Sequence, residues 1–136
     1  MDDAIKATAT RSGPTAFSHR AIARGHQLTV DEPKEQGGGD EGPTPQELLA
    51  ASLAGCTAIT MAMYAERKDW EIGTIEVACE YTVAERGAPT RFGLVLRLPR
   101  GLTDEQVQAL RVIAGKCPVH RTLDGEVVFD ERVELI

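Results

Sequence analysis

The feature that most constrains this chain is a run of eighteen residues without a charged side chain, from Leu48 to Ala65. A helix start stands directly before it: Thr44 can serve as N-cap, Pro45 fits the first helical position, and Glu47 completes a Thr-x-x-Glu capping box. The sequence therefore predicts one helix over residues 45–68, roughly 37 Å long. Because apolar residues fall on nearly every face, this helix is expected to be buried, and we favour a second subunit as part of its cover.

The rest of the chain predicts an α+β fold in a single domain over residues 1–136. A flexible loop is expected over residues 33–43, which are rich in glycine, proline and charge. Alternating apolar residues and turn signals predict an antiparallel strand pair after the long helix. The predicted order is β-β-α-β-β-α-β, with strands over 16–24 and 27–31, the long helix, strands over 74–84 and 92–98, a helix from Thr103 to Gly115, a helical turn over 118–123 and a strand over 126–136.

Composition narrows the class of partner. The net charge of −6 and the pI near 5.1 argue against a nucleic-acid partner. The charge-free run just reaches the length of a membrane span, but Ser52, Thr57 and Thr60 within it favour a buried helix, so no membrane is expected. Three cysteines and no apolar leader predict a cytoplasmic protein with free thiols.

Cys56 lies inside the long helix and has two interpretations. Cysteine is one of the most commonly buried residue types, so Cys56 can simply fill space. Alternatively it is a reactive thiol, because Ala54 and Gly55 leave room for a ligand beside the sulfur. Burial raises the pKa of a thiol, so a reactive Cys56 needs a cationic neighbour, and Arg20 and Arg24 of the predicted hairpin are the candidates.

Cys117 stands before Pro118 and is therefore held out of the helical region of backbone space. If a helical turn begins at Pro118, the thiolate form of Cys117 is favoured at its start, and the alternative is an ordinary linker residue. Because sixty-one positions separate Cys56 and Cys117, only the fold can bring them together. Cys79 falls on the core side of a predicted strand, which indicates core filling.

His120 follows Cys117 by three residues, a spacing compatible with metal ligation. No second pair with zinc-ligand spacing accompanies it, so no metal or other cofactor is expected. Cys56 and His120 could also form a cysteine-hydrolase pair, although the sequence offers no evident orienting acid or oxyanion hole.

The run from Gly42 to Thr57, followed by Lys116-Cys117-Pro118-Val119-His120-Arg121, resembles the OsmC/Ohr family, the osmotically induced protein C and organic hydroperoxide resistance proteins. The resemblance covers nearly the whole chain. Within the family, the sequence is most similar to an OsmC-like branch. It implies an intertwined homodimer in which two long central helices are wrapped by sheets from both chains.

The resemblance also implies an activity and a set of site residues. Family members reduce organic hydroperoxides, with a peroxidatic cysteine at the position of Cys56 and a resolving cysteine at that of Cys117. A hairpin arginine, for which Arg24 ranks ahead of Arg20, would hold the thiolate. The paired family glutamate falls on Gln46, with Glu47 beside it, so the activity is expected to be weak or the substrate altered.

These observations lead to one main hypothesis and one alternative. The main hypothesis is a thiol peroxidase: Cys56 becomes a sulfenic acid, Cys117 condenses with it to a disulfide, and an external dithiol, such as a lipoylated protein, reduces that disulfide. The alternative is a non-enzymatic dimer that binds a ligand or senses redox state.

Overall fold

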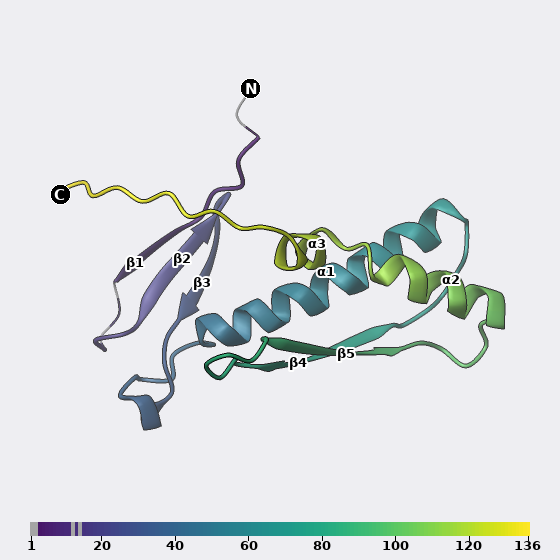
Figure 1. Cartoon of the computed structure of the whole chain (residues 1–136), viewed down its shortest axis with the longest axis horizontal. Coiled ribbons are helices and arrows are strands. Elements are labelled where there is room, and N and C mark those ends of the chain that lie inside the picture. The colour runs from purple at the N-terminus through teal and green to yellow at the C-terminus, as the bar shows by residue number, and fades with distance from the viewer. Residues whose placement is uncertain (1–2, 12, 14) are drawn as a thin grey trace. The chain divides into compact units, whose positions relative to one another are not determined.

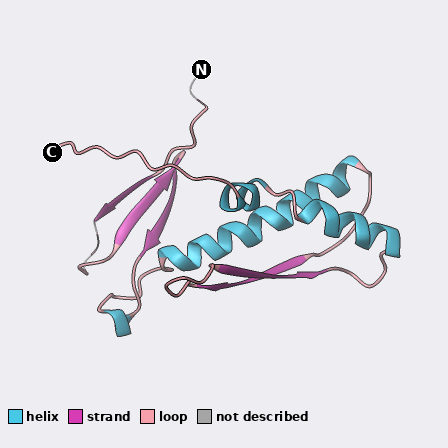
Figure 2. Cartoon of the chain, in the orientation of Figure 1, coloured by secondary structure: helices cyan, strands magenta, loops and turns pink. Residues whose placement is uncertain are grey.

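The computed structural model describes residues 3–11, 13 and 15–136. The chain divides into two compact units, one ending at Leu49 and the other beginning at Ala50, and each is considered by itself. Figures 1 and 2 follow the chain through three strands and a short 3-10 helix, then a long helix, a strand pair and two further helices. In order, the elements are β1 (Thr8–Arg11), β2 (His19–Ala23), β3 (His26–Val30), η1 (Lys34–Gln36), α1 (Pro45–Arg67), β4 (Glu76–Thr82), β5 (Arg91–Arg97), α2 (Asp104–Ala114) and α3 (Pro118–Asp124).

The first unit holds an antiparallel sheet in the order β1-β2-β3. The hairpin expected over 16–24 and 27–31 forms between β2 and β3, with Ala23 opposite His26. Arg24 and Gly25 make its turn with φ values of 52° and 87°, the positive values that a tight two-residue hairpin requires. The strand β1 was not predicted, because its Thr-Ala-Thr-Arg run lacks apolar alternation and becomes a strand by pairing with β2.

One buried carboxylate organises the loop between β3 and α1. Asp31 is only 1% exposed. Its Oδ1 accepts the Glu32 N–H at 2.7 Å, and its Oδ2 accepts the N–H groups of Gly39 and Glu41 at 3.2 and 3.1 Å. The Thr15 hydroxyl donates to Oδ2 at 3.5 Å. Burial alone would raise the pKa of Asp31, but these hydrogen bonds outweigh it and hold the pKa below its ordinary value.

The capping box predicted at the start of α1 is present. The Glu47 N–H donates to Thr44 Oγ1 at 3.0 Å, and Glu47 Oε1 accepts the Thr44 N–H at 2.9 Å. The helix then runs to Arg67, one residue short of the predicted end. A local sequence signal therefore defines the start of this element.

Within the single chain α1 is buried along one face only, and the predicted burial of the rest, with a second subunit as part of the cover, stays a prediction. Its fully buried residues repeat every four positions and define one face, formed by Leu53, Thr57, Met61 and Ala65. Ile59 and Met63, by contrast, are 59% and 61% exposed. By length and composition α1 also satisfies the requirements of a membrane span, as apolar core helices of other proteins do.

The core of the second unit lies where α1 and α2 meet (Figure 1). Met61 and Ala65 of α1 form one buried cluster with Leu110 and Ala114 of α2, and Ile72 completes it. The α2 helix begins at Thr103, whose side chain forms a capping box with Gln106. Partly buried residues of β4 and β5 pack against the same cluster, among them Val77 and Leu96.

The strand pair predicted after α1 is confirmed. Antiparallel pairing joins β4 to β5 from Glu76↔Arg97 to Thr82↔Arg91. Tyr81 and Phe92 are opposite each other in this register, and their rings stack with centroids 4.7 Å apart.

The final strand predicted over residues 126–136 is wrong. This segment has no regular secondary structure, and its apolar side chains are largely exposed, from 51% at Val127 to 123% at Ile136. The sequence alternates as a strand does, but a strand needs a partner for its backbone hydrogen bonds, and none is supplied within the described residues.

Candidate functional site

The α1 helix places Cys56 at the edge of its buried face. Cys56 is half-buried, and the next residue, Thr57, is completely buried. Gly55 precedes the cysteine, and a methyl group added there would meet no atom within 4 Å. The helix position before the cysteine therefore has room for a larger side chain, while the position after it is packed.

The second cysteine caps α3. Cys117 has extended backbone angles (φ −65°, ψ 141°), as expected before Pro118, which occupies the first helical turn. Its Sγ accepts the His120 N–H at 3.2 Å. Cys117 is completely buried. The sulfur is therefore the N-cap acceptor of α3, the role that a serine or aspartate oxygen has at other helix starts.

Two consecutive amides of α3 hold the two sulfurs. The N–H of Val119 donates to Cys56 Sγ at 3.5 Å, and the next N–H, of His120, donates to Cys117 Sγ. The two thiols also interact with each other, and each shifts the pKa of the other. The structure therefore brings together two cysteines that lie sixty-one positions apart.

The pKa values of the two cysteines shift in opposite directions. Burial raises the pKa of Cys56, and the hydrogen bond and negative charge of Cys117 raise it further. Burial would also raise the pKa of Cys117, but hydrogen bonds from Cys56 and the His120 N–H, with help from Thr57, lower it below its ordinary value. Within this unit Cys117 is thus the favoured thiolate and Cys56 holds the proton.

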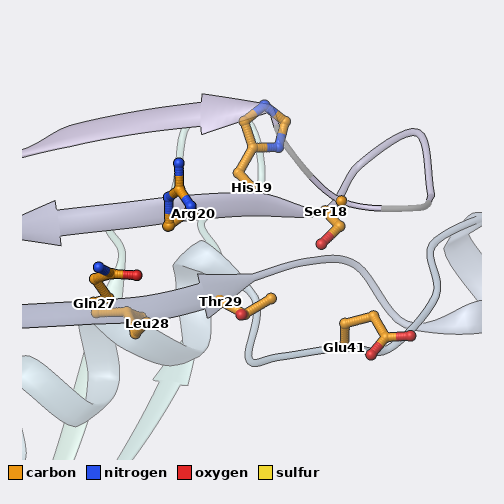
Figure 3. Close-up of a pocket in the computed structure, with 8 residues that line it drawn as sticks. Ser18, His19, Arg20, Gln27, Leu28, Thr29 and Glu41 are labelled. Atoms are coloured by element: carbon orange, nitrogen blue, oxygen red, sulfur yellow. The ribbon is translucent and has the colours of Figure 1, made fainter.

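The predicted Arg24 and Glu47 belong to the first unit. Arg24 is exposed at the tip of the β2–β3 turn, and Glu47 accepts the Thr44 N–H in the cap of α1. The alternative arginine, Arg20, lines a cavity of about 460 Å³ in the first unit. Figure 3 shows Arg20 beside Gln27 of the neighbouring strand at one end of this cavity and Glu41 at the other.

The other candidate groups stand as follows. His120 Nδ1 is buried without a hydrogen-bond partner among the described residues. Cys79 is half-buried on β4, and burial raises its pKa. Within residues 3–11, 13 and 15–136, no group of three or more His, Cys, Asp or Glu residues is placed to hold a metal ion.

Two contributors to the site were missed from sequence. The Val119 N–H could not be found, because a backbone donor leaves no signal in residue type. Thr57 could have been found, since it is a hydroxyl residue four positions after Leu53 on an otherwise apolar face, directly beside the candidate cysteine. The Val119 N–H donates to Cys56 Sγ, and Thr57 helps to lower the pKa of Cys117.

A thiol hydrogen-bonded to a partly charged thiolate is suited to two-electron oxidation. The sulfur that reacts first becomes electrophilic, and the second sulfur is already in contact with it. Donors fixed by the backbone need no rearrangement to stabilise the charge. This arrangement can therefore cycle between a dithiol and a disulfide.

Comparisons with known proteins identify the family of the chain. The family model described as OsmC-like protein matches residues 37–132, a range that includes both cysteines. No curated protein matches the chain.

Solved structures share the fold. An OsmC like protein from Mycoplasma pneumoniae is 23% identical with a TM-score of 0.74, covering 92% of this chain and 90% of its own. A Psychrobacter arcticus osmotic stress induced and detoxification response protein is 20% identical with a TM-score of 0.75, covering 90% of each chain. An organic hydroperoxide resistance protein from Elizabethkingia anophelis is 26% identical with a TM-score of 0.63, covering 92% of this chain and 91% of its own. The chain has an α+β fold and belongs to the OsmC/Ohr family of OsmC-like proteins.

Proposed function

We propose that this protein is a thiol-dependent peroxidase that reduces organic hydroperoxides to alcohols through Cys56 and Cys117. The observation that carries the proposal is the contact between the two thiols, each of which also accepts an amide N–H of α3. A cysteine that only fills a core needs neither a second thiol nor two aligned donors. The organic hydroperoxide resistance protein of Elizabethkingia anophelis supports the same class of substrate.

The reaction begins at Cys56. Its sulfur attacks the terminal peroxide oxygen, the S–O bond forms, the O–O bond breaks, and the alkoxide leaves and takes up a proton as the alcohol. The Cys56 proton passes to Cys117, the thiol that interacts with Cys56 and shifts its pKa. Cys117 then attacks the Cys56 sulfenic acid, so that a disulfide forms and water leaves. A dithiol supplies the two electrons that restore the pair.

Substrate preference follows from the surroundings of Cys56. The open space at Gly55 admits a group larger than a hydroxyl. Apolar side chains of α1 continue from it, and each methylene of an alkyl tail that they bury contributes about 0.8 kcal/mol. Organic hydroperoxides are therefore the preferred substrates, with hydrogen peroxide a poorer one.

A homodimer is part of the proposal. Apolar side chains are exposed on α1, at Ile59 and Met63, and along the segment from Val127 to Ile136. These side chains require a cover, which a single chain does not provide. The family resemblance implies a second copy as that cover. Sedimentation equilibrium at micromolar concentration should give twice the chain mass, and a monomer at all concentrations would contradict this part.

The deciding experiment counts thiols after a single turnover. The reduced protein is mixed with cumene hydroperoxide, and we expect the loss of two thiols per chain. Cys56→Ser should lose none, Cys117→Ser should lose one as a sulfenic acid that dimedone traps, and Cys79→Ser should behave as wild type. Thiols untouched by excess peroxide would overturn the proposal and favour a ligand-binding or redox-sensing protein.

A further inference from the structure

The two sulfurs of the pair differ in accessibility. Cys117 is completely buried, whereas Cys56 is half-buried beside the open space at Gly55. Thiol–disulfide exchange requires an incoming sulfur to approach one sulfur of the disulfide along the S–S axis. Of the two sulfurs, Cys56 offers that approach.

The two sulfurs also differ in the donors around them. Cys117 Sγ accepts the His120 N–H at 3.2 Å, while the Val119 N–H lies 3.5 Å from Cys56 Sγ. The sulfur that accepts the shorter hydrogen bond is the better leaving group, because the donor stabilises its negative charge when the S–S bond breaks. The donors therefore favour Cys117 as the sulfur that leaves.

Thr57 adds a donor that the helix does not need. Its hydroxyl donates to the Leu53 carbonyl at 2.8 Å, and in a regular helix that carbonyl already accepts the Thr57 backbone N–H. Thr57 is completely buried, it follows Cys56 directly in α1, and its hydroxyl helps to lower the pKa of the equally buried Cys117. Rotation about the C–O bond alone can turn the hydroxyl proton from the carbonyl to the sulfur.

We propose that the external thiol that reduces the Cys56–Cys117 disulfide attacks Cys56, and that Cys117 leaves as a thiolate stabilised by the Thr57 hydroxyl. This inference rests on the proposed function, since the disulfide is its oxidised state. It assigns the point of attack of the reductant and a role for Thr57.

The steps balance with a dithiol as the reductant. One thiolate of the dithiol forms a bond to Cys56 Sγ while the Cys56–Cys117 bond breaks and its electron pair stays on Cys117. The second thiol of the reductant then attacks its own linked sulfur, closes to a cyclic disulfide and releases Cys56, which takes up a proton. The dithiol is oxidised by two electrons and the cysteine pair is reduced by two.

The first test locates the incoming sulfur. The disulfide of the full-length protein is made with diamide, treated briefly with 2-mercaptoethanol, a monothiol that cannot release itself, and quenched with N-ethylmaleimide. Trypsin places Cys56, Cys79 and Cys117 on three separate peptides. We expect mercaptoethanol on Cys56 and maleimide on Cys117, and the reverse pattern would overturn the proposal.

The use of diamide separates this inference from the proposed function. If peroxide does not oxidise the protein but diamide does, the peptide pattern still decides where the reductant attacks. If even diamide forms no Cys56–Cys117 disulfide, the inference and the proposed function both fail.

The second test concerns Thr57. Thr57→Val keeps the shape of the side chain without its hydroxyl, and Thr57→Ser keeps the hydroxyl. We expect Thr57→Val to slow reduction of the disulfide by dihydrolipoamide by about three- to tenfold, and Thr57→Ser to stay within about twofold of wild type. Ultraviolet titration of the thiolate in the reduced protein should show a raised pKa for Cys117 in Thr57→Val alone. Wild-type reduction in Thr57→Val, or equal slowing in both folded variants, would contradict the role of the hydroxyl.

Discussion

The Val119 N–H points at the sulfur of Cys56 over 3.5 Å, although sixty-three positions separate the two residues. This hydrogen bond joins the start of α3 to the middle of α1. It sets the position of one sulfur while the next amide of the same turn sets the other. The redox pair is thus aligned by backbone groups, which no single side-chain substitution removes.

The space beside Cys56 can be tested by filling it. Gly55→Ala should raise the free energy of unfolding by about 0.5–1 kcal/mol, because alanine loses less entropy than glycine in a helix and the added methyl group meets no atom. If the space receives the alkyl group of the peroxide, the same change slows oxidation by cumene hydroperoxide more than by hydrogen peroxide. Urea unfolding and stopped-flow thiol oxidation measure the two effects.

Ala51→Gly is the control for this change, since Ala51 is exposed on the same helix. It should destabilise the protein by a similar amount without altering the ratio of the two peroxide rates. Equal slowing of both peroxides by Gly55→Ala would contradict a role in substrate selection.

Substituting Arg24 and Arg20 one at a time tests which of them holds the thiolate of Cys56. Arg24 has a φ of 52°, so Arg24→Asn removes the charge with a residue that tolerates this conformation. If Arg24 holds the thiolate of Cys56, as the family resemblance implies, this change should slow oxidation of Cys56 about tenfold, since loss of a cation beside a thiol raises its pKa. Arg20→Gln is the matched variant, and a larger effect there would reverse the assignment. The second-order rate with cumene hydroperoxide is the measurement.

The Asp31 carboxylate predicts a dependence of stability on pH. Its pKa in the folded protein lies below the ordinary value of 3.8, so its stabilising contribution is present above that value and is lost as the pH falls through the folded pKa. Asp31→Asn should lower the melting temperature at pH 7, because a neutral amide cannot accept the same N–H groups on both atoms. The gap to wild type should narrow as the pH falls below 3.8.

Asp40→Asn is the control for Asp31, because Asp40 is exposed and its φ of 55° suits asparagine. It should melt close to wild type at both ends of the pH range. A wild-type melting temperature for Asp31→Asn at pH 7 would show that the carboxylate does not anchor the loop.

The contact between α1 and α2 should dominate the stability of the second unit. Leu110 is completely buried in the cluster that also holds Met61, so Leu110→Ala should cost about 2–5 kcal/mol in the free energy of unfolding. Val112→Ala on the same helix removes a side chain that is 53% exposed and should cost much less. Chemical denaturation decides, and similar losses for both variants would contradict this placement of the core.

The elements that sequence predicted correctly are those with local signals. The Thr44–Glu47 capping box fixed the start of α1, and alternation from Val77 to Tyr81 indicated β4. Pairing over long distance carries no such signal. The β1 strand is polar and exists because β2 lies beside it, while residues 126–136 alternate like a strand but have no partner among the described residues.

The candidate site was predictable to the same extent. Residue type and the proline after Cys117 were enough to nominate both cysteines. Their proximity depends on how α1 and α3 pack. The opposite pKa shifts of the two cysteines depend on amide donors and on Thr57, and the sequence does not show where these groups lie. The places of Arg24 and Glu47 in the site stay predictions.

The sulfur of Cys117 both caps α3 and forms half of the redox pair. It caps the helix less well in the oxidised state than in the reduced state. In the dithiol it caps α3 by accepting the His120 N–H, and as a thiolate it does so with a full charge. In a disulfide the same sulfur is uncharged and a poorer acceptor, so the first turn of α3 loses part of its anchor each time the pair is oxidised. The amide hydrogen of His120 should therefore exchange faster in the disulfide, which makes the rigidity of this helix start a readout of the oxidation state of the protein.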